Sequence, residues 1–280
     1  GHALLEGVPG VAKTLLVRTM ATALDVDMAR IQFTPDLMPA DITGSLVWDA
    51  GSSAFEFRRG PVFTNLLLAD EINRTPPKTQ SALLEAMEER QVSVDGQTHA
   101  LADPFMVIAT QNPVEYEGTD PLPEAQLDRF LLKLELPLPG RDAEFGIVKR
   151  HRDGFNPLAL ADAGVRPVAS PADIAAARGA AARVDVSDTV LAYLVDVCRA
   201  TRESPSVRLG ASPRGATALL RTTRVWAFLQ GRGFATPDDV KAMAAPTLAH
   251  RIGLRAEADL EGLTAARVVE GVLAQVPVPR

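Results

Sequence analysis

The sequence predicts an α/β core followed by a mostly helical domain. In the first half, short apolar runs alternate with helical patterns, which is typical of a parallel sheet covered by helices. A glycine-rich loop separates the first apolar run from the first helical pattern. Beyond Pro137–Gly140 the composition becomes rich in alanine and helical. We therefore predict a core domain over residues 1–139 and a helical domain over residues 140–280.

Five apolar runs are expected to form the strands of the sheet. They are Ala3–Leu5, Ala29–Phe33, Asn65–Ala69, Phe105–Ala109 and Leu131–Leu138. The third and fourth runs are almost continuously apolar, as in central strands that are buried on both faces. Between them, residues 79–89 are expected to form a helix with Leu83, Leu84 and Met87 on one side.

Two β-hairpins are expected to interrupt the α/β pattern. Asp95-Gly96 is a two-residue turn signal at the centre of residues 91–100. The second hairpin is expected to pair Ser45–Trp48 with Ala54–Arg58. It comes between the second and third strands, where a simple nucleotide-binding fold needs only a helix.

The second half carries helix start signals and one apolar stripe. Three helix starts share a capping hydroxyl followed by proline at the first helical position. They are Ser170-Pro171, Ser212-Pro213 and Thr236-Pro237. Cys198 lies on the apolar side of a predicted helix, so we expect a buried structural thiol. It is the single cysteine of the chain, which excludes an intrachain disulfide.

The totals exclude several classes of protein. The chain has 280 residues and a net charge of −6, which argues against a general nucleic-acid or anionic-membrane binder, although a local basic patch remains compatible. No apolar run approaches the roughly 20 residues of a membrane span, and no secretory leader is present, so we expect a cytoplasmic protein. The chain opens without Met and almost inside a strand, which leads us to expect a further N-terminal segment.

The loop Gly7–Thr14 is predicted to bind phosphate. It reads Gly-Val-Pro-Gly-Val-Ala-Lys-Thr between a strand and a helix, and glycines let backbone N–H groups approach phosphate oxygens. Lys13 would neutralise the β- and γ-phosphates, and the Thr14 hydroxyl would bind Mg²⁺. Ala12 stands where glycine is usual. The alternative, an ordinary strand-to-helix turn, gives no reason for a lysine at a helix start, where the dipole disfavours a cation.

Polar residues also follow the third and fourth strands. Asp70 and Glu71 end the third strand, and ligands bind at the carboxyl ends of strands in α/β sheets. Asp70 can hold Mg²⁺, and Glu71 can polarise the water that attacks the γ-phosphate. The alternative is an acidic turn, which the phosphate loop disfavours. Asn112 can bind the attacking water or the γ-phosphate, or can simply form a turn before Pro113.

Six blocks carry a family resemblance that extends over essentially the whole chain. They are Gly7–Thr14, Gln32–Gly44, Leu68–Arg74, Pro77–Val92, Ala109–Pro113 and Glu124–Phe130. Through them the chain resembles the MoxR family of AAA+ ATPases, in which alanine often precedes the motif lysine. The resemblance implies an AAA+ P-loop core, with a parallel five-stranded sheet, helices on both faces and β-hairpin inserts, followed by an all-α lid domain.

The resemblance also implies roles for individual residues. Asn112 matches the γ-phosphate sensor, Glu71 the catalytic acid, and Arg129 an arginine finger that acts in trans on a neighbouring subunit. The residues alone leave Arg129 equally open as a solvated cation or a partner of Asp128. Thr14 and Asp70 are implied as the Mg²⁺ site. The nucleotide contacts implied are Gly7, Val8, Pro9, Gly10, Val11, Ala12, Lys13, Thr14, Leu15, Asp70 and, from the lid, Arg214.

By resemblance, the function is Mg²⁺-dependent ATP hydrolysis at the subunit interfaces of a homo-oligomeric ring, expected to be a hexamer. Hydrolysis would drive chaperone-like remodelling or cofactor insertion in client proteins, together with a partner carrying a von Willebrand factor A-type domain. Upstream residues that enclose adenine in the family are not contained in this chain. Trp48, Phe55 and Phe57 could contact a partner or pack the hairpin on its own domain.

Two other functions remain to be weighed. A nucleic-acid-dependent AAA+ motor or loader is disfavoured by the acidic balance, because neither hairpin is strongly basic. A nucleotide-dependent scaffold with little turnover is disfavoured because Asp70, Glu71, Asn112 and Arg129 are all present.

Overall fold

The computed structural model of the chain describes residues 1–111 and 122–279. Its contacts divide the chain into two compact units. The first consists of Gly1–Leu122 and Leu134–Ile174, and the second of Pro123–Lys133 and Ala175–Arg280. The short segment Pro123–Lys133 therefore groups with the helical half of the chain. The boundary predicted between residues 139 and 140 falls within the first unit and stays a prediction.

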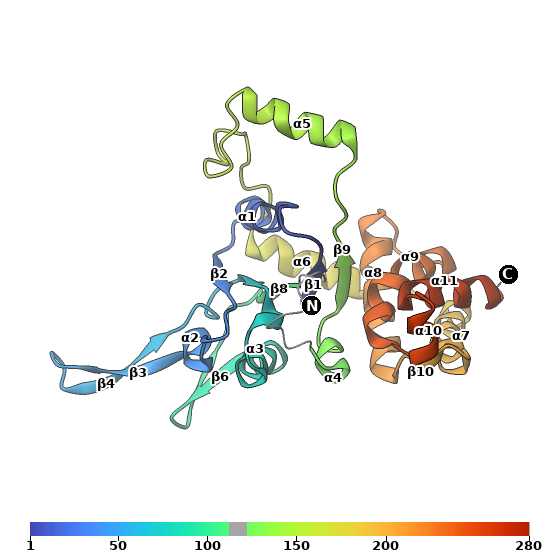
Figure 1. The fold of residues 1–280 in the computed structure, drawn as a ribbon, viewed down its shortest axis with the longest axis horizontal. Helices are drawn as coiled ribbons and strands as arrows, with labels where there is room; N and C mark the ends of the chain where they lie inside the picture. Colours follow the sequence, from blue (N-terminus) through green and yellow to red (C-terminus); the bar gives the residue numbers. More distant parts are fainter. Residues whose placement is uncertain (112–121, 280) are drawn as a thin grey trace. The chain divides into compact units, whose positions relative to one another are not determined.

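A five-stranded sheet contains all five predicted strands, in the order β2-β5-β8-β1-β9; strands β2, β8, β1 and β9 are labelled in Figure 1. The strands are β1 (Ala3–Glu6), β2 (Met28–Gln32), β5 (Leu66–Asp70), β8 (Met106–Gln111) and β9 (Leu132–Glu135). The pairs β1–β8, β2–β5 and β5–β8 are parallel, as predicted. Because parallel neighbours end at the same edge, the residues that follow β1, β5 and β8 are brought together there.

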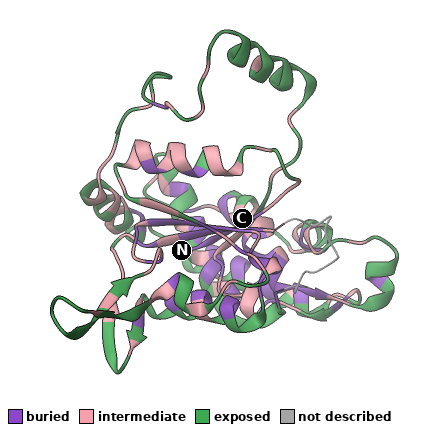
Figure 2. Cartoon of the chain, turned by 60° about the vertical axis from the view of Figure 1, so that its left-hand side comes forward, coloured by how far each residue is buried: buried purple, intermediate pink, exposed green. Residues whose placement is uncertain are grey.

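Helices α1 (Lys13–Leu24) and α3 (Pro77–Glu89) lie on opposite sides of this sheet (Figure 1). Val17 of α1 packs in one cluster with Leu5 and Leu68 of the strands. The apolar side predicted for α3 is buried as well. The central strands are accordingly purple in Figure 2, which confirms that both faces of the sheet are covered.

Both predicted hairpins are present. One pairs β3 (Gly44–Asp49) with β4 (Ala54–Arg59), and the other pairs β6 (Gln91–Val94) with β7 (Gln97–Ala100). They are among the most exposed parts of the first unit and are largely green in Figure 2.

The aromatic residues of the β3–β4 hairpin divide between packing and exposure. The Phe57 ring stacks on His99 of the second hairpin, with 4.2 Å between ring centroids. Trp48 and Phe55 instead meet each other edge to face and are 54% and 66% exposed. The packing alternative is therefore confirmed for Phe57, whereas the other two rings remain accessible.

The remaining helical elements before residue 153 are short, apart from α5. They are α2 (Pro39–Thr43), the 3₁₀ turn η1 (Ile72–Arg74), α4 (Glu124–Leu127) and α5 (Arg141–Arg152). Every residue of α5 is exposed or half-buried, and the helix is mostly green in Figure 2. The chain after α5 nevertheless returns to helix α1, because Val168 donates a backbone hydrogen bond to Ala23.

The second half is helical apart from one short antiparallel ladder. Its elements are α6 (Pro171–Ala182), α7 (Asp188–Glu203), β10 (Val207–Leu209), α8 (Pro213–Leu229), α9 (Pro237–Leu248), η2 (Ala249–Arg251), β11 (Gly253–Leu254), α10 (Ala256–Leu260) and α11 (Ala265–Gln275). Strands β10 and β11 form the ladder. The helical lid is thus confirmed, and the ladder is an addition that the sequence did not suggest.

All three helices predicted to begin at proline do so. In α8 the Ser212 hydroxyl accepts a hydrogen bond from the backbone of Gly215. In α9 the Asp239 carboxylate accepts the backbone N–H of Thr236, at 2.7 Å. These contacts satisfy N–H groups that otherwise lack partners at a helix start.

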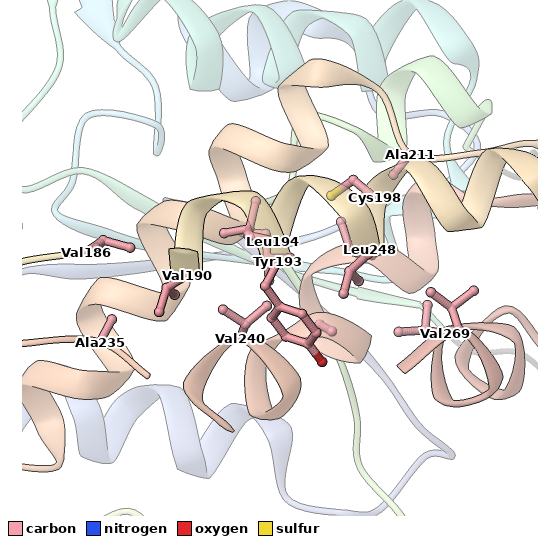
Figure 3. Packing of buried hydrophobic residues seen from close by; sticks show 14 of the residues in the cluster. Val186, Val190, Tyr193, Leu194, Cys198, Ala211, Ala235, Val240, Leu248 and Val269 are labelled. Carbon is pink, nitrogen blue, oxygen red and sulfur yellow. The ribbon is translucent and has the colours of Figure 1, made fainter. Parts of the chain in front are cut away.

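The core of the second unit is built around α7 (Figure 3). The predicted stripe consists of Val190, Leu191, Leu194, Val195 and Cys198. Val190, Leu194 and Cys198 are buried with residues of α9 and α11, such as Val240 and Val269, whereas Val195 is 46% exposed. Cys198 is 1% exposed, and burial raises its pKa to about 11. The thiol is therefore protonated at neutral pH and unreactive, as expected for a structural cysteine.

Within residues 1–111 and 122–279, no helix combines the length and the apolar composition needed to cross a membrane.

Candidate functional site

The loop between β1 and α1 has the backbone conformation of a phosphate-binding turn. Gly10 has φ +90°, which favours glycine, and Gly7 lies so close to Leu136 that an added Cβ would be 2.7 Å from its carbonyl oxygen. Ala12 is also left-handed, with φ 60° and ψ 30°. This explains why glycine is usual at the Ala12 position, and it shows that alanine can occupy the same conformation.

The strain at Ala12 gives a testable stability prediction. A left-handed residue other than glycine costs about 1–2 kcal/mol, whereas glycine adds roughly 0.5–1 kcal/mol of backbone entropy loss on folding. We therefore expect Ala12→Gly to raise the free energy of unfolding by up to about 1 kcal/mol, as measured by urea denaturation. Ala82→Gly, inside α3 of the same unit, should instead lower it by about 1 kcal/mol. Equal losses in both variants would contradict the strain at Ala12.

The N-terminus of α1 points its first N–H groups at this loop. Among the described residues, no side chain caps this end of the helix, and the Leu16 backbone N–H donates to the carbonyl of Ala12 at 3.0 Å. The backbone N–H groups of Lys13, Thr14 and Leu15 are thus available to an anion, which the helix dipole also favours. The Lys13 ammonium folds back onto the loop and donates to the carbonyls of Gly7 and Val8, at 2.7 and 3.1 Å.

Two acids follow β5 in different conformations. Asp70 is the last residue of the strand and is buried. Glu71 comes next and is left-handed, with φ 58° and ψ 50°. Such a conformation is uncommon for a residue with a β-carbon, and it clusters at functional sites. It turns the chain sharply after the strand, and both Asp70 and Glu71 line the same cavity.

Thr110, near the end of β8, connects the two acids. Its hydroxyl donates to Oδ1 of Asp70 at 2.6 Å and accepts the backbone N–H of Glu71 at 2.9 Å. One side chain thus fixes the Asp70 carboxylate and the Glu71 backbone together. Asn112, predicted as the γ-phosphate sensor, lies outside the described residues.

The loop, the helix start and the two acids line a single cavity of about 480 Å³ within the first unit. That volume is in the range of small-ligand sites. The predicted residues that line it are Pro9, Gly10, Ala12, Lys13, Thr14, Leu15, Asp70 and Glu71. Gly7, Val8 and Val11 belong to the same loop without lining the cavity.

Several lining residues were not predicted from the sequence. They are Arg30, Gln32, Thr110, Gln111, His151 and Pro157. Arg30 and Gln32 carried a signal, because two polar side chains two residues apart share one face of a strand. His151 and Pro157 carried none, since they come from α5 and the segment after it, far along the chain from the loop.

The two arginines predicted as site residues, Arg129 and Arg214, lie in the second unit. The Asp128 carboxylate lies between two cations of that unit, since Oδ1 accepts Nε of Arg251 at 2.7 Å and Oδ2 is 3.5 Å from Nε of Arg214. Arg129 follows Asp128 directly and is half-buried. The Asp128 carboxylate is thus engaged by the lid arginines Arg251 and Arg214.

A buried pair anchors the segment that carries Arg129. Arg251 has a side chain that is 4% exposed, and it donates to the carbonyl oxygen of Phe130 at 2.7 Å. The Nε2 atom of His250 lies 2.9 Å from the same oxygen. Burial lowers the pKa of His250 to about 3, so the ring is neutral at physiological pH. These contacts hold Asp128 and Phe130, and thereby the backbone of Arg129 between them.

The fold and the cavity define a class of protein, and comparisons with known proteins bear on it. A family model described as "ATPase family associated with various cellular activities (AAA)" matches residues 2–132, and a model of the AAA lid domain matches residues 199–272. A crystal structure of a proposed ATPase from Cytophaga hutchinsonii has a TM-score of 0.90 and 41% identity, covering 100% of this chain and 86% of that one. The chain is an AAA ATPase.

Relatives with curated names narrow the class. "Chaperone MoxR1" of Mycobacterium tuberculosis is 42% identical over 100% of this chain and 75% of its own length. "Protein MoxR" of Paracoccus denitrificans is 32% identical over 100% of this chain and 88% of its own length. "Uncharacterized protein YeaC" of Bacillus subtilis is 48% identical over 100% and 86%, respectively. This chain belongs to the MoxR family of AAA+ ATPases, as the sequence resemblance predicted.

Proposed function

We propose that this ATPase hydrolyses ATP with Mg²⁺ at the subunit interfaces of a homo-oligomeric, hexameric ring. The observation that carries the proposal is the shared cavity. The open N-terminus of α1, the Lys13 side chain and the two acids Asp70 and Glu71 all line it. A triphosphate needs backbone donors and a cation on one side and an acidic metal site on the other.

The residues present fit a magnesium ion. Mg²⁺ prefers oxygen ligands and is usually held by one or two protein side chains together with phosphates. Thr14 supplies a hydroxyl and Asp70 a carboxylate, and both line the cavity. When bound, the ion would neutralise charge that develops on the phosphates.

The chain's own residues then divide the chemistry. The N–H groups at the start of α1 and the ammonium of Lys13 hold the phosphates and offset their charge. Glu71 accepts a proton from the attacking water, for which its half-buried position at the cavity after β5 is suited. Thr110 fixes the Asp70 carboxylate and the Glu71 backbone relative to each other by its two hydrogen bonds. Asn112 is proposed as the γ-phosphate sensor.

The ring proposal rests on Arg129 and on the family. Arg129 lies in a segment that the buried His250 and Arg251 hold in place, and a guanidinium that contributes to catalysis needs such a fixed base. We propose that Arg129 acts on the nucleotide of a neighbouring subunit and that Arg214 of α8 serves as a second cationic contact.

The proposed role of Arg129 predicts a complementation between inactive variants. Arg129→Ala should bind ATP but turn over about 100-fold more slowly or worse, because an arginine finger acts only on the transition state. Lys13→Ala subunits lack a nucleotide site but retain Arg129. Mixing the two variants should therefore restore measurable ATPase activity, since each Arg129→Ala site would receive a finger from its neighbour.

Two further measurements make this test decisive. Arg199→Ala removes an exposed cation from α7 of the same unit and should keep full activity. Co-assembly of the mixed subunits is checked by light scattering. Mixed rings that assemble without recovering activity, or a strictly monomeric form that hydrolyses ATP at the full rate, would refute the action in trans.

We propose a chaperone-like role for the ring, in which hydrolysis remodels or matures client proteins. Its support is the relative named "Chaperone MoxR1" and the accessible pair Trp48 and Phe55 on the β3–β4 hairpin, which could contact a client. A partner with a von Willebrand factor A-type domain and a cytoplasmic location stay predictions from the resemblance. Affinity capture with Glu71→Gln and ATP would identify the clients.

A further inference from the structure

Strand β2 contributes two polar side chains to the acidic end of β5. The strands pair in parallel with Arg30 opposite Leu68 and Gln32 opposite Asp70. Because side chains alternate along a strand, Arg30 and Gln32 lie on the same face of the sheet. Both line the cavity that contains Asp70 and Glu71. Neither side chain has a role in the function proposed above.

Arg30 and Gln32 join the two acids into one hydrogen-bonded chain. The Arg30 guanidinium donates to Oδ2 of Asp70 from Nη2 at 2.8 Å and from Nε at 3.1 Å. The same Nη2 donates to Oε1 of Gln32 at 2.6 Å. The Gln32 amide in turn donates from Nε2 to Oε2 of Glu71 at 2.7 Å. The chain therefore runs Asp70–Arg30–Gln32–Glu71.

The orientation of the Gln32 amide depends on Arg30. An amide has one accepting and one donating end. Since a guanidinium only donates, it must face the oxygen of Gln32, and this turns the NH₂ group toward the Glu71 carboxylate. Loss of the guanidinium would leave the amide free to rotate. Arg30 thus acts on Glu71 through Gln32, while it acts on Asp70 directly.

Both oxygens of the Asp70 carboxylate are engaged by protein donors. Arg30 binds Oδ2, and the Thr110 hydroxyl binds Oδ1. A divalent cation at Asp70 needs carboxylate lone pairs and would place its charge beside the guanidinium. The cation and the guanidinium carry like charges and would repel each other. Solvent screening weakens this repulsion, because the Arg30 side chain is 48% exposed. Arg30 and the cation therefore compete for the same carboxylate.

We propose that Arg30 is a positioning residue that couples the metal ligand to the catalytic acid. While Arg30 binds Asp70, it also orients the Gln32 amide, which then donates a hydrogen bond to the Glu71 carboxylate. When a divalent cation binds at Asp70, Arg30 releases that carboxylate and the Gln32 amide loses its alignment, while Arg74 still donates to Oε2 of Glu71 at 3.1 Å. This inference rests on the Mg²⁺ site of the proposed function.

The test measures cation binding directly. Mn²⁺ is titrated into the full chain with ADP present, and bound Mn²⁺ is followed by electron paramagnetic resonance. Arg30→Ala should lower the half-saturating Mn²⁺ concentration about threefold to tenfold, because a competing charge is removed. Arg30→Lys keeps the charge and should shift it less. Arg58→Ala removes an exposed cation from β4 of the same unit and should leave it unchanged.

A double-mutant cycle tests the coupling through Gln32. Gln32→Ala should also lower the half-saturating concentration, by less than Arg30→Ala, because Arg30 loses one of its partners. If Gln32 acts on Asp70 only through Arg30, the double variant should match Arg30→Ala alone, whereas independent effects would add. Circular dichroism melting of each variant separates unfolding from these effects.

The outcomes are distinct. An Arg30→Ala variant that binds Mn²⁺ as the wild type does, or more weakly, overturns the competition. Additive effects in the cycle overturn the coupling. A folded wild-type chain that shows no ADP-linked Mn²⁺ binding refutes the proposed metal site itself, and with it this inference. The proposal is supported if Arg30→Ala and Gln32→Ala each lower the half-saturating Mn²⁺ concentration and the double variant matches Arg30→Ala alone.

Discussion

Replacing Lys13 by alanine is expected to weaken ATP binding by about 100-fold or more, since several charge-assisted hydrogen bonds to the phosphates are lost at once. Isothermal titration calorimetry with ATP and Mg²⁺ measures this loss. The ammonium lies at the start of α1, where the dipole opposes a cation, and it is held by the loop carbonyls of Gly7 and Val8. A phosphate ligand supplies the negative charge that makes this position favourable.

The contacts of Lys13 with its own loop require a second variant. Alanine removes the hydrogen bonds to Gly7 and Val8 as well as the charge, so the loop itself could change. Lys13→Gln keeps N–H donors for these carbonyls and removes only the charge. It should lose nearly as much affinity as Lys13→Ala if electrostatic attraction dominates. Lys78→Ala, at an exposed position in the first turn of α3, is the matched control and should bind normally. Retained micromolar affinity in both Lys13 variants would reassign the loop.

Much of the fold could be predicted from local sequence patterns. The apolar runs give β1, β2, β5 and β8 within one or two residues of their ends. The Asp95-Gly96 turn gives the second hairpin. Turn chemistry, capping and the alternation of apolar residues are local, so a sequence shows them directly. The fifth strand is shorter than predicted, because the apolar residues beyond Glu135 continue outside the strand.

The partners of individual side chains could not be predicted in the same way. Arg30 and Asp70 are 40 residues apart, and Arg251 and Asp128 are 123 apart. Which strand lies next to which, and which helix end meets which loop, depends on tertiary packing that no periodicity records. The sequence therefore located the carboxylates at the strand end without revealing the side chains of β2 that bind them.

The backbone conformation at two positions could not be predicted from the sequence either. Ala12 and Glu71 are both left-handed, with φ 60° and 58°. Local propensity disfavours this conformation for residues with a β-carbon, so sequence patterns favour an ordinary turn at each. Both residues lie at the cavity, where the surrounding structure imposes the conformation. Other residues with a β-carbon are left-handed as well but do not line this cavity, namely Asp25, Ser53, Arg90 and Asp95. The conformation therefore points to a site only together with the cavity.

Replacing Glu71 by glutamine is expected to separate ATP binding from hydrolysis. The Glu71 carboxylate accepts hydrogen bonds from Gln32 at 2.7 Å and from Arg74 at 3.1 Å. A glutamine of the same shape keeps an oxygen that can accept from both, so the left-handed turn and the cavity should persist. What it lacks is the basicity of a carboxylate, so it cannot take a proton from water. Loss of a general base lowers turnover by about 100-fold or more.

The contrast between binding and turnover is what tests the role of Glu71. Calorimetry should give Glu71→Gln an ATP affinity close to that of the wild type, whereas steady-state phosphate release should fall to a small fraction. Glu85→Gln, which makes the same chemical change on the exposed side of α3, should leave both unchanged. Phosphate release near the wild-type rate would mean that another group activates the water. A parallel loss of ATP affinity would instead mean that Glu71 shapes the cavity. Only retained binding with lost turnover fits an acid that acts on water alone.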